Sequence, residues 1–142
     1  MNVLISACLL GVACRYDGRS VENAGAIKLL GRHNCIPVCA EILGGLPTPR
    51  LPCESVGGKI IRSDGADMTE QYVRGANEVL RLARLYGCSV AVLKERSPSC
   101  GGGKIYDGSF RGLLTDGDGV TAALLKAHGI KVIGESQLEE LL

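Results

Sequence analysis

The chain has 142 residues, of which 46% are hydrophobic and 22% charged, and its formal net charge is +1. This composition excludes a disordered chain, and the length suits one domain with its own core, which we assign to residues 1–142. Sixteen Lys and Arg against fifteen Asp and Glu leave no basic field for a phosphate backbone, so we expect a small-molecule partner and no nucleic acid.

Seven cysteines raise the question of whether they pair. The first basic residue, Arg15, follows the apolar N-terminal run instead of preceding it, so we expect no signal peptide. No run approaches the roughly 18 apolar residues that cross a bilayer, so we expect no membrane partner. We therefore expect a cytoplasmic protein with reduced thiols, in which cysteines more often serve a metal, a cluster or nucleophilic chemistry than a disulfide framework. The oligomeric state does not follow from these features.

The N-terminal part predicts two buried strands joined through a helix. Residues 2–7 form a nearly continuous apolar run, typical of a parallel strand, which stops at Cys8. A Gly-containing loop follows, and then a helix over residues 23–30. Residues 35–39 predict a second short strand that also ends at a cysteine.

The middle of the chain predicts an irregular excursion, a long helix and a third strand. Residues 44–61 are rich in Gly and Pro, with a small ribbon at 59–62. Apolar residues at three- and four-residue spacing predict a helix over 69–86, capped by Asp67 or Thr69. Residues 89–93 predict a buried strand, after which the chain enters a loop.

The C-terminal part continues the alternation of strands and helices. It predicts a hairpin over 105–114, a helix over 120–127, a strand over 131–134 and a capping box over 136–139 that opens a last short helix. Strands that alternate with helices favour a mainly parallel sheet covered on both faces. We therefore predict a three-layer, Rossmann-like α/β fold with small hairpin excursions.

Three cysteines lie at or after the predicted ends of strands. Ligands of parallel sheets bind beyond these carboxyl ends, so we expect the thiols of Cys8, Cys39 and Cys100 to converge in one crevice. Three thiolates on a 4Fe-4S cluster leave one iron position open as a Lewis acid for sulfur. The alternative is that these cysteines are small packed side chains, which is our interpretation of three others. Those three are Cys35, Cys53 and Cys88.

The loop before Cys100 carries further candidates for binding. Ser97 and Ser99 flank a proline, and Gly101 follows, so N–H groups of this turn can hold an anion or a carbonyl oxygen. The alternative is a turn capped by its own hydroxyls. Arg15 and Arg50 follow cysteine-bearing motifs, and each can bind a substrate carbonyl or hold a loop through a carboxylate.

Three groups of motifs carry a resemblance to a known family. They are CLLG at 8–11 followed by CRYDG at 14–18, VCAE at 38–41 followed by GGLPTPR at 44–50, and LKERSPSCG at 93–101. In these motifs and their order the chain resembles the thiouracil desulfidase family, and the resemblance covers nearly the whole domain. It implies an enzyme that replaces the thiocarbonyl sulfur of 2-thiouracil, or of a related thiolated base, with oxygen, giving uracil and sulfide.

The resemblance also implies a cofactor and residue roles. The family holds a 4Fe-4S cluster on one cysteine from each motif, which carries over to Cys8, Cys39 and Cys100. Glu41 would then be the acid/base, and Ser97 the assisting hydroxyl. One departure stands out, since the second motif of the family has Cys-Pro-Glu and this chain has Ala40 at the proline position.

Two alternatives belong to other classes. A cysteine-nucleophile phosphatase needs C-x5-R, but Arg15 lies one residue too far from Cys8 and the loop lacks the Gly and Ser of a phosphate cradle. A structural or sensory metal-binding module would close the site with Cys14 as a fourth thiolate. Loss of metal in Cys14→Ser would indicate the closed site, whereas loss of turnover in Glu41→Ala with the cluster intact would indicate catalysis.

Overall fold

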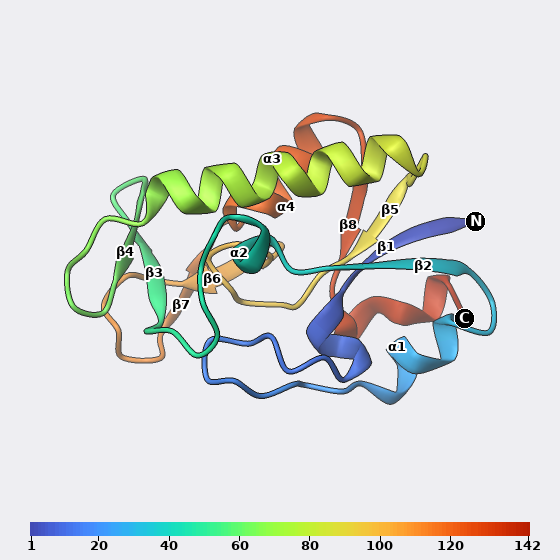
Figure 1. The fold of residues 1–142 in the computed structure, drawn as a ribbon, viewed down its shortest axis with the longest axis horizontal. Helices are drawn as coiled ribbons and strands as arrows, with labels where there is room; N and C mark the ends of the chain where they lie inside the picture. Colours follow the sequence, from blue (N-terminus) through green and yellow to red (C-terminus); the bar gives the residue numbers. More distant parts are fainter.

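A four-stranded parallel sheet forms the centre of the fold. The computed structural model describes residues 1–142, and its main sheet has the strand order β2-β1-β5-β8. The strands are β1 (Asn2–Ser6), β2 (Asn34–Val38), β5 (Val90–Val92) and β8 (Lys131–Ile133). Helices lie on both faces of this sheet (Figure 1), so the predicted three-layer α/β fold is confirmed.

The two faces of the sheet carry different helices. One face packs against α3 (Thr69–Leu85) and α4 (Val120–Ala127), and the other against α1 (Ala24–Leu29) with the 3-10 helices η1 (Ala7–Leu10) and η2 (Glu135–Glu140). Alternate residues of a strand point to opposite faces.

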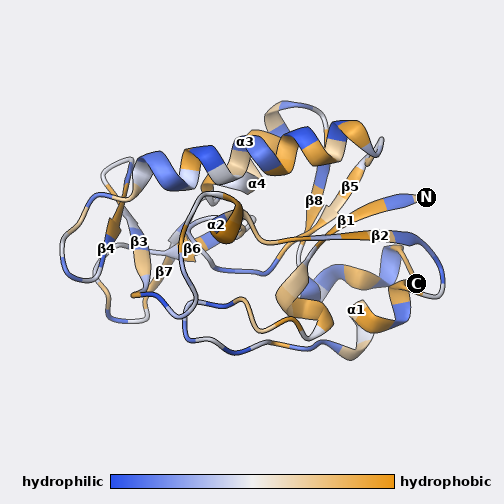
Figure 2. Cartoon of the chain, in the orientation of Figure 1, coloured by the Kyte–Doolittle hydropathy of each residue, from blue (hydrophilic) through white to orange (hydrophobic).

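Strand β1 shows why the sheet strands are apolar at nearly every position. Its Val3 and Ile5 join the core on the α1 side, whereas Leu4 joins the core under α3 and α4. All three side chains are fully buried. Figure 2 shows the same contrast, with largely hydrophobic central strands and an α3 that alternates between hydrophilic and hydrophobic residues.

A short helix that the sequence did not predict, α2 (Ala40–Leu43), follows β2. It packs on α3 with the two backbones in close approach, because a Cβ added at Gly75 would lie 1.9 Å from the carbonyl oxygen of Ala40. A Cβ at Gly44 would similarly meet the backbone of α3 at Gln71. Both positions therefore require glycine, and α2 is fixed on α3.

Two antiparallel hairpins lie beyond one end of the main sheet (Figure 1). They pair β3 (Cys53–Val56) with β4 (Lys59–Arg62), and β6 (Lys104–Tyr106) with β7 (Leu114–Asp116). The ribbon predicted at 59–62 is β4, but its partner β3 was missed because it follows a Pro-rich segment. No helix of the fold is long and apolar enough to span a membrane.

Two predictions of helix ends were wrong. The N-cap residue of α3 is Met68, without a side-chain cap, although Asp67 accepts a hydrogen bond from the backbone of Thr69. At the C-terminus, the Gln137 side chain accepts the N–H of Gly134, and the helix η2 that begins there is of the 3-10 type. The predicted capping box at 136–139 therefore lies two residues too late.

Candidate active site

A cavity of about 370 Å³ lies at the topological switch point of the main sheet, where the order of the strands reverses. β1 is flanked by β2 and β5, so the connections that leave β1 run to opposite sides of it, and such a switch point is where parallel sheets bind ligands. The structure brings six predicted site residues to the wall of this cavity: Cys8, Arg15, Cys39, Glu41, Ser97 and Cys100.

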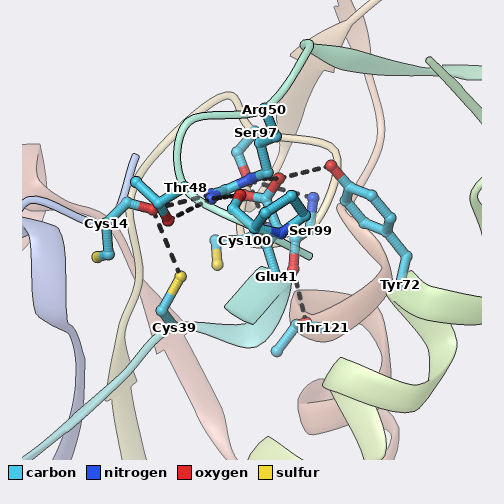
Figure 3. Close-up of polar contacts among 11 residues, drawn as sticks. Cys14, Cys39, Glu41, Thr48, Arg50, Tyr72, Ser97, Ser99, Cys100 and Thr121 are labelled. Atoms are coloured by element: carbon cyan, nitrogen blue, oxygen red, sulfur yellow. Dashed lines mark hydrogen bonds and ion pairs between the residues drawn. The ribbon is translucent and has the colours of Figure 1, made fainter. Parts of the chain in front are cut away.

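The thiols that face the cavity form a connected group. All seven cysteines of the chain are free. The Cys39 thiol donates to the carbonyl oxygen of Cys14 over 3.9 Å (Figure 3). The thiols of Cys39 and Cys8 both influence the pKa of Cys14, which is raised. The hydrogen bond with Cys14, together with burial, holds the pKa of Cys39 far above its ordinary value. Burial, and then the Glu41 carboxylate, raises the pKa of Cys100 to about 12.

These thiols fit an iron–sulfur cluster better than a single ion. No group of three or more His, Cys, Asp or Glu side chains is arranged to hold one metal ion. A cluster of four irons takes each thiolate on a different iron, so it accepts ligands that are further apart than those of one zinc. The donors here are unpaired cysteines from three separate segments around one cavity, namely η1, the N-terminus of α2 and the turn at Cys100. The residues present therefore fit the cofactor that the motifs imply.

Helix α2 positions Glu41 at the cavity. Cys39 is its N-cap residue and Ala40 its first helical residue. Proline is favoured at this first position because the missing N–H has no partner within the helix there. Alanine starts the same helix, and the packing of α2 on α3 fixes its orientation. The absence of the family's proline therefore does not turn Glu41 away from the cavity, whose wall it forms.

One oxygen of the Glu41 carboxylate is held by two donors (Figure 3). The phenol of Tyr72, on α3, donates to Oε1 over 2.5 Å, and the guanidinium Nε of Arg50 donates to the same oxygen over 3.4 Å. Oε2 takes no hydrogen bond from the chain and is left for substrate or water. Burial, and then the neighbouring carboxylate, raises the pKa of Tyr72, which therefore stays protonated as a donor.

Arg50 ties three segments of the cavity wall together. Its side chain is only 5% exposed. Besides Glu41, it donates to the carbonyl oxygen of Cys14 over 2.9 Å, and to the Pro47 carbonyl and the Thr48 hydroxyl over 3.1 Å each. From the sequence, Arg50 had the same two alternatives as Arg15, and the structure shows the second, a loop held through a carboxylate. Tyr72 was placed only on the apolar face of its helix. Only the fold shows that both side chains converge on Glu41.

The turn before Cys100 is capped by its own hydroxyl. The Ser97 Oγ accepts the backbone N–H groups of Ser99 over 3.1 Å and of Cys100 over 2.7 Å. Ser99 itself is fully buried, and its hydroxyl pairs with that of Thr121 over 2.9 Å (Figure 3). The N–H of Gly101 donates to the Ser97 carbonyl oxygen. The structure therefore does not place Ser99 and Gly101 with the other predicted site residues, since these polar groups bond inside the protein and neither residue lines the cavity.

Comparison with known proteins agrees with this geometry. The sequence profile of the 2-thiouracil desulfurase family matches residues 3–137. The chain belongs to this family. A similar sequence, the uncharacterized protein YbbK of Bacillus subtilis (strain 168), is 43% identical over 150 aligned positions that cover 99% of each chain. The solved structure of the 4Fe-4S-dependent thiouracil desulfidase TudS is similar with a TM-score of 0.93 at 44% identity, covering 99% of this chain and 94% of that one.

In this member of the 2-thiouracil desulfurase family, the Arg15 guanidinium makes only weak contacts with the rest of the chain. Its guanidinium lies 4.0 Å from the Asp17 carboxylate and 5.6 Å from the centre of the Tyr16 ring. About a third of its side chain is exposed, and it lines the cavity. Arg15 is therefore available to a ligand, in contrast to Arg50.

The phosphatase alternative does not fit the loop after Cys8. A phosphate cradle needs backbone N–H groups that point at the anion. In this chain Cys8 itself lies in η1, and the N–H groups of Gly11 and Val12 donate to the carbonyl oxygens of Cys8 and Ala7. Those donors are not available to a phosphate group, which favours the interpretation as a desulfidase over that as a phosphatase.

Proposed function

We propose that this chain is an iron–sulfur-dependent desulfidase that replaces the thiocarbonyl sulfur of 2-thiouracil, or of a related thiolated base, with oxygen. The products are uracil and sulfide. The observation that carries the proposal is the combination, in one cavity, of free thiols from three segments of the chain with a carboxylate held at one oxygen and open at the other. The family profile and the likeness to TudS support the same reaction.

Cys8, Cys39 and Cys100 are the proposed ligands of a 4Fe-4S cluster. When bound on three cysteines, the cluster offers one open iron position, which acts as a Lewis acid toward the thiocarbonyl sulfur. The protein must release the thiol protons to hold it, because thiolates are the metal ligands. Cys14 is the other thiol beside Cys8 and Cys39, so its exchange tests whether three or four thiolates bind the cluster.

Glu41 is the proposed acid/base. Its Oε2 takes a proton from water as the water oxygen forms a bond to C2 of the base, and returns it when the carbon–sulfur bond breaks and sulfide leaves. Tyr72 and Arg50 hold Oε1 and so fix the direction of the free oxygen. Ser97 keeps the Cys100 turn in place and has its own hydroxyl proton available at the cavity. Arg15 is the proposed contact for the exocyclic oxygen of the base.

Residues 1–142 would then act as a single desulfidase-like domain on a small thioamide. The near-zero charge offers no field for intact nucleic acid. We place the reaction in the cytoplasm, because seven unpaired cysteines suit a compartment that keeps thiols reduced.

The test begins with protein purified without oxygen. Iron and acid-labile sulfide would be measured together with visible absorption, followed by incubation with 2-thiouracil and assay of uracil and sulfide. Brown protein that releases both products supports the proposal. Protein that stays colourless and free of iron after anaerobic cluster reconstitution would overturn it.

The Cys14→Ser variant separates the enzyme from a closed metal-binding module. A closed site would use Cys14 as its fourth thiolate, since Cys14 also faces this cavity, beside Cys8 and Cys39. An enzyme with an open iron position keeps its iron and its absorption in this variant. Complete loss of iron would show that the site is closed, and it would favour a structural or sensory role.

A further inference from the structure

Aromatic side chains gather at the cavity. The chain has four Tyr, one Phe and no Trp. Four of these five rings line this one cavity: Tyr16, Tyr72, Tyr106 and Phe110. Aromatic rings bind flat ring systems through their faces, in stacked or edge-to-face arrangements. Such a concentration, in a chain so poor in aromatic residues, points to a flat ring as the ligand.

Tyr106 and Phe110 are the rings of this group whose side chains make no hydrogen bond or cation contact, and Phe110 is the more exposed of the two. The Tyr72 hydroxyl is committed to Glu41, and the Tyr16 ring lies under the Arg15 guanidinium. Phe110 is 38% exposed although it lines the cavity, so part of its ring stays open to solvent and to a ligand. It belongs to the loop between β6 and β7.

The backbone at Phe110 is held in a conformation that the residue does not favour by itself. Its φ is +57°, in the left-handed region that residues other than glycine rarely adopt. Oε1 of Glu54, on β3, accepts the N–H of Phe110 over 3.1 Å and that of Gly108 over 2.9 Å. Glu54 is 8% exposed and makes no ion pair. A buried carboxylate therefore holds this loop, and strained positions that are fixed in this way are typical of ligand-binding sites.

The loop is also held by close packing against β3. A Cβ at Gly108, where φ is +92°, would lie 2.5 Å from the carbonyl oxygen of Ser55. The hairpin β6–β7 thus lies directly against β3 (Figure 1). Because its backbone is anchored at two places, the loop presents Phe110 at a fixed point of the cavity wall.

We propose that Phe110 is a specificity-determining residue that stacks on the pyrimidine ring of the substrate. This inference rests on the proposed function and assigns the selection of a flat, aromatic base to one side chain. Stacking does not depend on the atom at C2, so Phe110 holds 2-thiouracil and uracil alike. It contributes equally to the bound substrate and to the transition state, so its removal raises KM and leaves kcat unchanged.

The test compares variants of the anaerobically prepared, cluster-loaded protein. Phe110→Ala should raise KM for 2-thiouracil at least about fivefold, the lower end of what stacking on one ring contributes. Phe110→Tyr should behave like the wild type. Leu113→Ala is the matched control, since Leu113 is an exposed residue of the same loop that does not line the cavity.

A second substrate distinguishes stacking from a merely structural role. The ring of 5,6-dihydro-2-thiouracil is saturated at two positions and no longer flat. The wild type should prefer 2-thiouracil by kcat/KM, and Phe110→Leu, which keeps an apolar side chain, should lose that preference. An unchanged preference in Phe110→Leu, or an unchanged KM in Phe110→Ala, would overturn the proposal.

Calorimetric titration with uracil separates this inference from the proposed function. Uracil has no sulfur, so its binding reports on the ring alone. Wild-type protein that binds uracil in a Phe110-dependent manner but releases no sulfide from 2-thiouracil would overturn the desulfidase function and leave the stacking site standing. Sulfide release with uracil affinity unchanged in Phe110→Ala would overturn the stacking site alone. Protein that neither binds uracil nor turns over would overturn both.

Discussion

The two ends of the main sheet both carry cysteines, but in different surroundings. At the amino end, Cys88 precedes β5 and is buried among apolar residues, and burial alone raises its pKa. At the carboxyl end, Cys39 and Cys100 also have raised pKa values, but other thiols and Glu41 contribute to the shift. A raised thiol pKa therefore does not identify a functional cysteine. What distinguishes Cys39 and Cys100 from Cys88 is that they share the wall of one cavity with Glu41.

Among the variants that test this difference between the two ends, exchange of Cys39 should have the largest effect on iron binding and activity. Cys39→Ser removes a proposed cluster ligand, so we expect iron, visible absorption and sulfide release to fall to background. Cys88→Ala is the matched control, because it removes a buried thiol from the other end of the sheet and should cost only about 1 kcal/mol of stability. Iron analysis and thermal unfolding measure both. Full iron content in Cys39→Ser, or none in Cys88→Ala, would contradict the contrast between the two ends.

Exchange of Glu41 should stop turnover while the cluster remains. Glu41→Gln keeps the size of the side chain but cannot take up a proton, so kcat should fall about 100-fold or more. Iron content and absorption should equal those of the wild type. Glu78→Gln, an exposed position on α3, serves as the control and should retain wild-type rates. Wild-type kcat in Glu41→Gln would remove the acid/base role.

The convergence of thiols at the carboxyl end was predictable from sequence. Apolar runs that end at Cys8 and Cys39 identify parallel strands, and parallel strands end at the same edge of a sheet. The short helices η1 and α2 were missed because four residues cannot show a helical period. The side chains around Glu41 could not be predicted either, since the apolar face of α3 gives no indication that the Tyr72 hydroxyl meets a residue 31 positions away.

Removal of the Tyr72 hydroxyl should have a smaller effect than the loss of Glu41. Tyr72→Phe keeps the packing of α3 and removes the donor to Oε1. A hydrogen bond to a charged group is worth about 1.5–3 kcal/mol, so kcat should fall about tenfold or more while KM changes little. Tyr86→Phe is the control, because that ring is half exposed and lies outside the cavity. An effect on KM alone would show that Tyr72 binds substrate and does not position Glu41.

Exchange of Ser99 should leave the kinetics unchanged and lower stability. Ser99→Ala leaves the buried Thr121 hydroxyl without its hydrogen-bond partner, which should lower the free energy of unfolding by about 1–3 kcal/mol. Removing both partners in Ser99→Ala with Thr121→Val should cost less than the sum of the single changes, because no buried hydroxyl is then left unpaired. Denaturant unfolding of the four proteins of this cycle measures the coupling.

Comparison with Ser97→Ala distinguishes two serines that are only two residues apart. Ser97 faces the cavity and holds the amide of Cys100, so Ser97→Ala should disturb a proposed ligand and lower activity. Ser99 faces α4, and its loss should reach the cavity only through stability. If Ser99→Ala raised KM at temperatures where the variant is fully folded, substrate would contact this turn from its buried side. Ser99 would then belong to the wall of the cavity as well as to the core.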